Sequence, residues 1–196
     1  MKALSPAFYA RPADLVARRL LGHFVVSTVG GLRTVGRIVE TEAYLGPHDP
    51  ASHAYRNRRT ERTERMYGQP GTAYVYFTYG MHWCLNAVTG REGYPAAVLI
   101  RALEPVAGLG AMRRRRGRVP DRMLCAGPAR LCRALGITGK LNGAALQGGP
   151  LTILRAPPSR RPIIATPRIG ITRATAWPLR YVFADSRSAS RPSAAR

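Results

Sequence analysis

The chain has 196 residues, 45% of them hydrophobic, which is enough for one globular domain with a sizeable core and excludes wholesale disorder. Its charge is strongly one-sided, with 31 Lys and Arg against 10 Asp and Glu and a formal net charge of +21. No apolar run approaches the ~18 residues of a membrane-spanning helix. The first residues contain no apolar stretch of signal-peptide length, so no membrane association is expected.

The positive charge comes almost entirely from arginine, since Lys2 and Lys140 are the only lysines. Such an excess attracts polyanions, and nucleic acid is the commonest polyanion that a soluble protein meets. The arginine bias has a second explanation, the codon usage of a GC-rich genome. Composition therefore indicates nucleic-acid binding and a cytoplasmic, nucleoid-associated location, with a non-catalytic Arg-rich binding protein as the alternative.

The three cysteines, Cys84, Cys125 and Cys132, form no CxxC pair, and an odd number is a poor basis for a disulfide framework. Together with the histidines they fit no closed zinc-binding spacing. We expect buried, inert thiols, no metal site and no cofactor.

In chain order, the first half of the sequence predicts a helix followed by a hairpin. Residues 12–21 have helical apolar spacing, 23–28 and 34–41 have the character of strands, and Gly30-Gly31 predicts the tight turn between them. The basic, poorly periodic segment 47–71 is expected to be a surface loop with one helical turn at most.

The second half continues with a further hairpin. Residues 72–89 alternate and are rich in aromatic and β-branched side chains, with a bend expected near Tyr79-Gly80. A strand is predicted over 95–103 and a helix after Pro105. The run Arg113–Arg118 has the composition of a flexible basic loop.

Gly127-Pro128 is expected to open a helix that ends by Gly136. Short strands are predicted at 151–154, 163–164 and 180–183. The low-complexity segment 186–196 has the composition of a disordered basic tail. The predicted fold class is α+β: a single mixed domain, residues 1–185, with antiparallel β-hairpins and surrounding helices.

Glu40 and Glu42 are expected on the same face of the strand GRIVETEAYLG, because alternate residues share a face. A carboxylate beneath a sugar stabilises the positive charge that develops when a glycosidic bond breaks, and it can deprotonate the attacking water. The alternative is that both carboxylates only neutralise nearby arginines. The spacing alone favours this alternative.

Aromatic side chains cluster in the same part of the chain, and they are Tyr44, His53, Tyr74, Tyr76 and Tyr79. Aromatic rings hold flipped bases, and they attract a cationic alkylated purine especially well. A side chain at a hairpin tip can enter the minor groove and fill the gap left by an extruded nucleotide. Aromatic stripes on strands are more often core, and periodicity does not decide between the two.

Four blocks carry a resemblance to a known family. Residues 36–89 (GRIVETEAYLGPHDPASHAYRNRRTERTERMYGQPGTAYVYFTYGMHWCLNAVT) are similar to the signature half of the alkyladenine (3-methyladenine) DNA glycosylase family. RALEP at 101–105, CAGPARLCRALGI at 125–137 and PRIGI at 167–171 resemble its later blocks in the same order. The similarity spans residues 6–184, although the ending that follows PRIGI is shorter than the family's.

The resemblance implies a catalytic role for Glu42, which matches the general base that activates water, while Glu40 matches a non-catalytic neighbour. Arg101 matches the arginine that positions this water together with the backbone carbonyl of Ile169. The lysines fall in no site block, so the resemblance favours hydrolysis without a Schiff base or strand cleavage.

The resemblance also implies a base pocket. Tyr44, His53 and Tyr76 match residues that stack around the flipped base, and Ala51 matches a backbone position at the base edge. Asn86 matches the side chain that crowds the exocyclic amine of guanine.

Tyr79 matches the wedge that enters the minor groove, so one hairpin is expected to project there. Met66 and Met81 match residues that flank the opened site. The implied partner is double-stranded DNA containing damaged purines, bound by a monomer. The implied activity is excision of alkylated or deaminated purines, with 3-methyladenine, 7-methylguanine, hypoxanthine and ethenoadenine all open as lesions. Another alternative is an enzyme of this fold whose substrate is RNA or single-stranded DNA.

Overall fold

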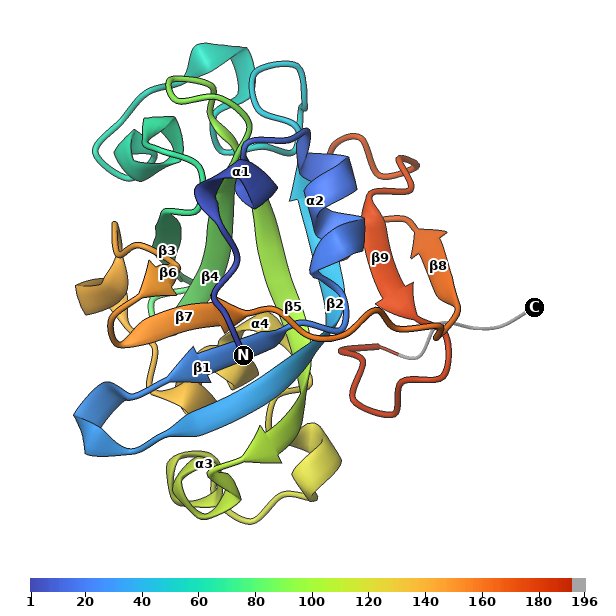
Figure 1. Cartoon of the computed structure of the whole chain (residues 1–196). Helices are drawn as coiled ribbons and strands as arrows, with labels where there is room; N and C mark the ends of the chain where they lie inside the picture. The colour runs from blue at the N-terminus through green and yellow to red at the C-terminus, as the bar shows by residue number, and fades with distance from the viewer. Residues whose placement is uncertain (192–196) are drawn as a thin grey trace.

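The computed structural model describes residues 1–191 and is built around a curled, nine-stranded sheet whose paired strands are all antiparallel (Figure 1). The main strand order is β3-β4-β5-β2-β1-β7-β6, and β9 pairs with both β2 and β8. The strands are β1 (Phe24–Ser27), β2 (Thr34–Tyr44), β3 (Ala73–Thr78), β4 (His82–Thr89), β5 (Ala96–Ala107), β6 (Gln147–Gly148), β7 (Leu151–Leu154), β8 (Ile163–Thr166) and β9 (Arg180–Phe183).

Helices pack in front of and behind this sheet in the view of Figure 1. The α-helices are α1 (Pro6–Tyr9), α2 (Ala13–Leu20), α3 (Leu109–Arg116) and α4 (Pro128–Leu135). Short 3-10 helices are η1 (Val29–Gly31), η2 (Tyr55–Asn57), η3 (Glu64–Tyr67), η4 (Asp121–Met123) and η5 (Gly139–Leu141). The α+β fold class predicted from the sequence is confirmed.

The core forms because two amphipathic helices, α2 and α4, cover parts of the long central strands β2 and β5. Helix α2 packs on these strands through Val16 and Leu20, which are fully buried. Helix α4 covers β4 and β5 through Leu131 and Leu135. The thiols of the three cysteines are free and buried, as the sequence predicted.

The predicted elements have the observed order, but several bounds differ. β2 and β5 continue further than expected, to Tyr44 and Ala107, because the two strands pair with each other along this whole length, from Tyr44 opposite Ala97 to Val35 opposite Ala107. The 47–71 segment contains η2 and η3 rather than one helical turn at most. Among the described residues, no helix is long and apolar enough to cross a membrane.

The run Arg113–Arg118 is not the flexible loop predicted, since its first four residues form the end of α3. Arginine is a good helix former, and the helix ends at Gly117, whose positive φ of 77° suits a helix C-terminus. Arg113 forms two hydrogen bonds to Asp121, and Arg116 donates to the carbonyl of Leu124. These contacts fix a segment whose composition alone is typical of a loop.

The expected disordered tail also differs from the structure where it begins. Ser186–Arg191 fold back onto the sheet, Ser188 is buried, and Ser190 contacts a buried carboxylate of β2. The remaining residues of that expected tail, 192–196, lie outside the described residues.

Candidate active site

A cavity of about 740 Å³ opens between the sheet and two loops, a volume in the range typical of small-molecule sites. It is lined by residues of β2, β3, β4 and β5, the 50–66 loop and the 169–173 loop. Most of the residues singled out in the sequence line it, namely Tyr44, Ala51, His53, Met66, Tyr76, Tyr79, Asn86, Arg101 and Ile169. Segments distant in the sequence therefore meet at one site.

Glu42 lies directly behind the cavity wall and is completely buried. Its Oε1 accepts the backbone N–H of Ile169 at 2.7 Å, and its Oε2 accepts the hydroxyl of Tyr44 at 3.0 Å. Oε2 also lies 3.2 Å from Nη1 of Arg101. Burial raises the pKa of Glu42 above its ordinary value, and Arg101 and the Ile169 N–H offset this only in part.

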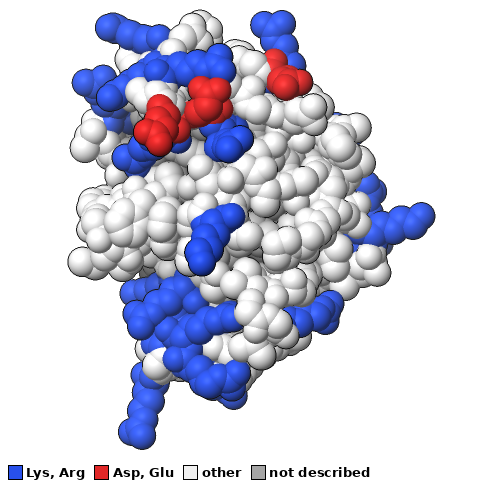
Figure 2. Space-filling view, turned by 90° about the vertical axis from the view of Figure 1, so that its left-hand side faces the viewer, with Lys and Arg blue, Asp and Glu red and all other residues white. Residues whose placement is uncertain are grey.

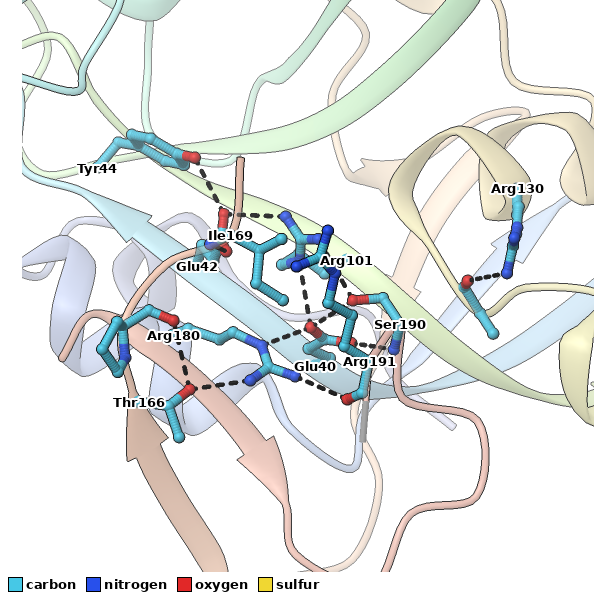
Figure 3. A network of polar contacts seen from close by, with 12 residues as sticks. Glu40, Glu42, Tyr44, Arg101, Arg130, Thr166, Ile169, Arg180, Ser190 and Arg191 are labelled. Carbon is cyan, nitrogen blue, oxygen red and sulfur yellow. Dashed lines mark hydrogen bonds and ion pairs between the residues drawn. The ribbon is translucent and has the colours of Figure 1, made fainter. Parts of the chain in front are cut away.

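Two irregularities in the β2–β5 ladder bring Arg101 to both carboxylates. Ile38 pairs with Leu103 and Glu40 with Ala102, so Val39 is an extra residue on β2; Thr41 then pairs with Ile100, so Arg101 is an extra residue on β5. A bulged residue leaves the regular ladder and its side chain is re-aimed. Arg101 thus lies between Glu40 and Glu42 (Figure 3).

The two carboxylates differ sharply in their surroundings. Burial alone would raise the pKa of Glu40, but Arg180, Arg101 and the N–H of Ser190 together hold it below its ordinary value. Glu40 is therefore stabilised as an anion, whereas burial disfavours the ionised form of Glu42. A base needs this second environment, because a raised pKa makes a carboxylate a better proton acceptor.

Aromatic rings form the opposite part of the cavity. The rings of His53 and Tyr76 meet edge to face at 4.7 Å between centroids, and Tyr74 and Tyr76 lie 5.3 Å apart. The hydroxyl of Tyr74 contacts Nδ1 of His53 at 2.9 Å. Burial, with Arg62 and Arg58 nearby, lowers the pKa of His53 to about 4, so its ring is neutral at pH 7.

Asn86 and Ala51 have fixed orientations at the cavity wall. The side-chain Nδ2 of Asn86 donates to the carbonyl of Tyr74 at 3.0 Å, and the residue is almost fully buried. The N–H of Ala51 donates to Oδ1 of Asp49 at 3.0 Å. The polar edge of the cavity is thus held by contacts within the protein.

The hairpin tip carries large apolar side chains in solvent. Tyr79 is 82% exposed and Met81 69% exposed. Tyr79 and Gly80 have φ values of 51° and 66°, and the N–H of Met81 donates to the carbonyl of Thr78, as in a tight hairpin turn. A tyrosine with positive φ is strained, and such strain concentrates at functional sites.

The two methionines have different positions. Met81 does not line the cavity and lies at the exposed tip. Met66 lines the cavity but is buried against Tyr74, Val88 and Ala97, so it forms part of the wall.

Comparison with known proteins identifies the family to which the chain belongs. The profile of the family described as Methylpurine-DNA glycosylase (MPG) matches residues 7–187. The chain belongs to the methylpurine-DNA glycosylase family. It is thus a DNA glycosylase, an enzyme of DNA repair that hydrolyses N-glycosyl bonds.

Relatives of similar length support the same family. A protein of Methanoculleus marisnigri is 49% identical over 192 residues, which cover 96% of this chain and 98% of that protein. A protein of Carboxydothermus hydrogenoformans is 46% identical over 186 residues, 94% of this chain and 96% of its own. Both are provisionally named 3-methyladenine DNA glycosylase.

Sequence reasoning missed the polar residues that hold the site of this glycosylase together. Asp49 and Arg168 form a buried ion pair that joins the two loops of the cavity. Arg180 and Ser190 hold the carboxylate of Glu40. The scarcity of acidic residues was a usable signal for Asp49, but no local pattern indicated Ser190.

Proposed function

We propose that this glycosylase flips an alkylated or deaminated purine out of duplex DNA and hydrolyses its N-glycosidic bond, leaving an abasic site. The observation that carries the proposal is the placement of Glu42, a buried carboxylate of raised pKa at the wall of an aromatic cavity, beside Arg101. Such a carboxylate can accept a proton from water and stabilise the cationic sugar as the base departs.

The carboxylate of Glu42 has an acceptor direction that its present partners do not use. Each carboxylate oxygen has two acceptor directions, and Oε1 uses one of them for the Ile169 N–H. We infer that the attacking water donates to Oε1 and that Arg101, 3.2 Å from Oε2, keeps the carboxylate charged for this step. The carbonyl of Ile169 is the second group proposed to orient the water.

The electron-rich rings of the pocket attract a positively charged purine. The guanidinium of Arg62 lies 5.0 Å from the centroid of the Tyr76 ring. Arg168 lies 4.8 Å from the centroid of Tyr44. Neutral His53 adds no repulsion at pH 7. We propose that the flipped base stacks between Tyr76 on one side and Tyr44 with His53 on the other.

The outer surface is suited to hold a DNA backbone. Figure 2 shows Lys and Arg side chains gathered at the upper and lower ends of the face in view, with the lower group at the level of α3 in Figure 1. Phosphate contacts by such groups give salt-dependent, sequence-independent binding. We propose that the exposed Tyr79 then enters the minor groove and fills the space of the extruded nucleotide.

Hydrolysis without strand cleavage is the form of the reaction that the cavity supports. Amine catalysis requires a free amino group at the sugar, and none of the described residues that line the cavity is a lysine. The enzyme is therefore proposed to be monofunctional.

The proposal is tested with an end-labelled duplex that contains a single hypoxanthine or ethenoadenine. Wild type, Glu42→Gln and Glu104→Gln are compared, and breaks are scored with and without alkali. Glu104 is the matched control because it pairs with Arg161 and does not line the cavity. We expect alkali-dependent cleavage by wild type and by Glu104→Gln, and none by Glu42→Gln although it still binds the duplex.

Two results would replace the proposal with an alternative. Duplex binding without release of any modified purine by wild type would favour a non-catalytic binding role. Faster release from single-stranded DNA or RNA than from the duplex would indicate a different substrate.

A further inference from the structure

The segment that follows β9 reaches the interior beside the proposed catalytic residues (Figure 3). Ser190 donates its backbone N–H to Oε2 of Glu40 at 2.6 Å and its hydroxyl to Oε1 at 2.7 Å. The next residue, Arg191, accepts a hydrogen bond at its carbonyl from Nη2 of Arg180 at 3.1 Å. The segment thus bonds twice to a carboxylate that is itself fully buried.

The carboxylate of Glu40 accepts four hydrogen bonds in this arrangement, three of them at Oε1. Besides the two bonds from Ser190, Oε1 accepts Nε of Arg180 at 2.7 Å and Nε of Arg101 at 3.1 Å. Arg180 is held in turn by Thr166, whose hydroxyl accepts Nη1 at 2.9 Å. Oε2 accepts only the Ser190 N–H, so it keeps an acceptor direction that a second nitrogen of Arg101 could use.

The guanidinium of Arg101 is shared among three partners. Its Nε donates to Glu40, its Nη1 lies 3.2 Å from Oε2 of Glu42, and its Nη2 donates to the hydroxyl of Ser190 at 3.3 Å. Without Ser190, Nη2 and Nε would be free to form the two-point pair that arginine prefers with one carboxylate, here Glu40. That pairing would rotate Nη1 away from Glu42.

We propose that Ser190 is a positioning residue of this glycosylase: by holding Nη2 of Arg101 on its hydroxyl, it keeps this nitrogen from Oε2 of Glu40 and leaves Nη1 directed to Glu42. The relevance of this for catalysis rests on the function proposed above. Ser190 touches neither the proposed site of the base nor that of the water, so it acts through Arg101. A residue beyond the last strand, Ser190, then helps to position the arginine beside Glu42.

The charged and titratable groups around Glu42 define what a change at Ser190 alters. They include Arg101 of β5, Tyr44 and Glu40 of β2, Cys84 of β4 and Arg180 of β9, which lies opposite Glu42 in the ladder. Of the two cations, Arg180 bonds to Glu40 and only Arg101 pairs with Glu42. Withdrawal of its Nη1 raises the pKa of Glu42 further, because the buried carboxylate then loses its compensating charge.

The direct test is the titration of Glu42 by NMR in chains labelled with ¹³C at the glutamate side-chain carboxyl. The chain has only six glutamates, and Glu42→Gln identifies the resonance. We expect Ser190→Ala to raise the pKa of Glu42 by about 1 unit, and Ser190→Thr, which keeps the hydroxyl, to restore it. Ser190→Cys, close in size but a much weaker donor, provides the same comparison if the alanine variant does not fold.

Ser186→Ala is the matched control, since the hydroxyl of Ser186 donates to Oε1 of Glu104 in the same segment but away from Glu42. It should leave the titration unchanged. If wild type releases a modified purine, the acidic limb of its single-turnover rate should move to higher pH in Ser190→Ala alone.

The two proposals fail separately. An inactive wild type in which Ser190→Ala still shifts the titration of Glu42 contradicts the proposed function and leaves the positioning role intact. A folded Ser190→Ala variant with an unchanged titration overturns the positioning role, whatever the activity.

Discussion

Asp49 and Arg168 form a completely buried two-point ion pair, with 2.5 Å between Oδ2 and Nη1 and 2.8 Å between Oδ1 and Nη2. The same carboxylate accepts the backbone N–H groups of Leu45 and Ala51 at 3.1 and 3.0 Å. The guanidinium also donates to the carbonyl of Ala43 at 3.0 Å. One pair thus joins the loop after β2 to the segment that carries the Glu42 ligand.

Asp49→Asn should be among the most destabilising conservative changes in this protein. It leaves the guanidinium of Arg168 buried without a counter-charge, and breaking a buried pair in this way costs about 3–5 kcal/mol. Urea unfolding followed by circular dichroism measures the loss. Glu64→Gln is the matched control, because its pair with Arg59 is exposed and should contribute little. Equal midpoints for the two variants would contradict the prediction.

The rate of base release should depend on pH differently for neutral and cationic lesions. Glu42 must be ionised to act as a base, and burial raises its pKa, so both lesions should show a rate that rises from an acidic limb above the ordinary carboxyl range. A neutral hypoxanthine also needs a proton to leave, so its rate should fall again at high pH. A cationic 7-methylguanine should reach a plateau. Single-turnover rates from pH 5 to 9 distinguish the two, and identical profiles would contradict the mechanism.

Glu42→Gln should become more stable relative to wild type as pH rises. A carboxyl whose pKa is raised in the folded state stabilises the fold below its unfolded-state pKa, near 4.5, and loses that contribution as pH rises through the folded-state pKa. Glutamine does not ionise, so the difference in unfolding free energy should move in favour of the variant by about 1.4 kcal/mol for each unit of the shift. Urea unfolding at pH 4.5, 6 and 8 measures this. A difference that is constant over this range would show that the pKa of Glu42 is not raised.

Local patterns predicted much of the fold, because helices and hairpins follow from apolar spacing and turn residues within a few positions. The hairpin with its bend at Tyr79-Gly80 and the helix after Gly127 are examples. The site depends instead on contacts between distant segments. Nothing local indicates that Arg101 leaves the β5 ladder, or that Ser190 bonds to Glu40 across 150 positions of the chain.

The resemblance to a family named the residues around the cavity, and the structure places most of them there. The resemblance did not name the residues that fix the cavity-lining residues in place. Asp49 and Arg168 are such residues, since they bond to backbone groups of β2 and of the loop that follows it and not to the proposed base. Polar pairs of this kind have no periodicity, and their partners are defined only once the chain has folded.

Asn86→Ser should weaken the discrimination against normal guanine. The hydrogen bond from Nδ2 of Asn86 to the carbonyl of Tyr74 fixes the amide at the cavity wall, where it is proposed to crowd the exocyclic amine of guanine. A shorter side chain leaves room for that amine, and a difference of this size is worth about 10-fold in the ratio of rates. Release of guanine and hypoxanthine from matched duplexes measures the ratio.

Asn142→Ser is the control for this comparison, since Asn142 binds the backbone N–H of Val75 and does not line the cavity. It should alter stability without altering the ratio. An unchanged ratio in Asn86→Ser would mean that guanine is excluded at another position.

Tyr79→Asn should slow release of a lesion from duplex DNA by about 10-fold or more. Unstacking a base step costs roughly a few kcal/mol, and the variant no longer offsets this free energy by filling the gap. Tyr79 has a positive φ of 51°, and asparagine tolerates this conformation, so the turn should fold as well as in wild type. The variant lacks the ring that is proposed to fill the gap in the base stack. Single-stranded substrate has no such gap, so its rate should not change.

The salt dependence of duplex binding provides an independent check on this assignment. The slope of log affinity against log salt concentration reports the number of neutralised phosphates, and Tyr79 carries no charge. Wild type, Tyr79→Asn and Tyr79→Trp should therefore share one slope, while only the tryptophan variant, which keeps a large ring, retains most of the duplex rate. Equal loss of rate on duplex and single-stranded substrates in Tyr79→Asn would show that Tyr79 acts within the base pocket and not as a wedge.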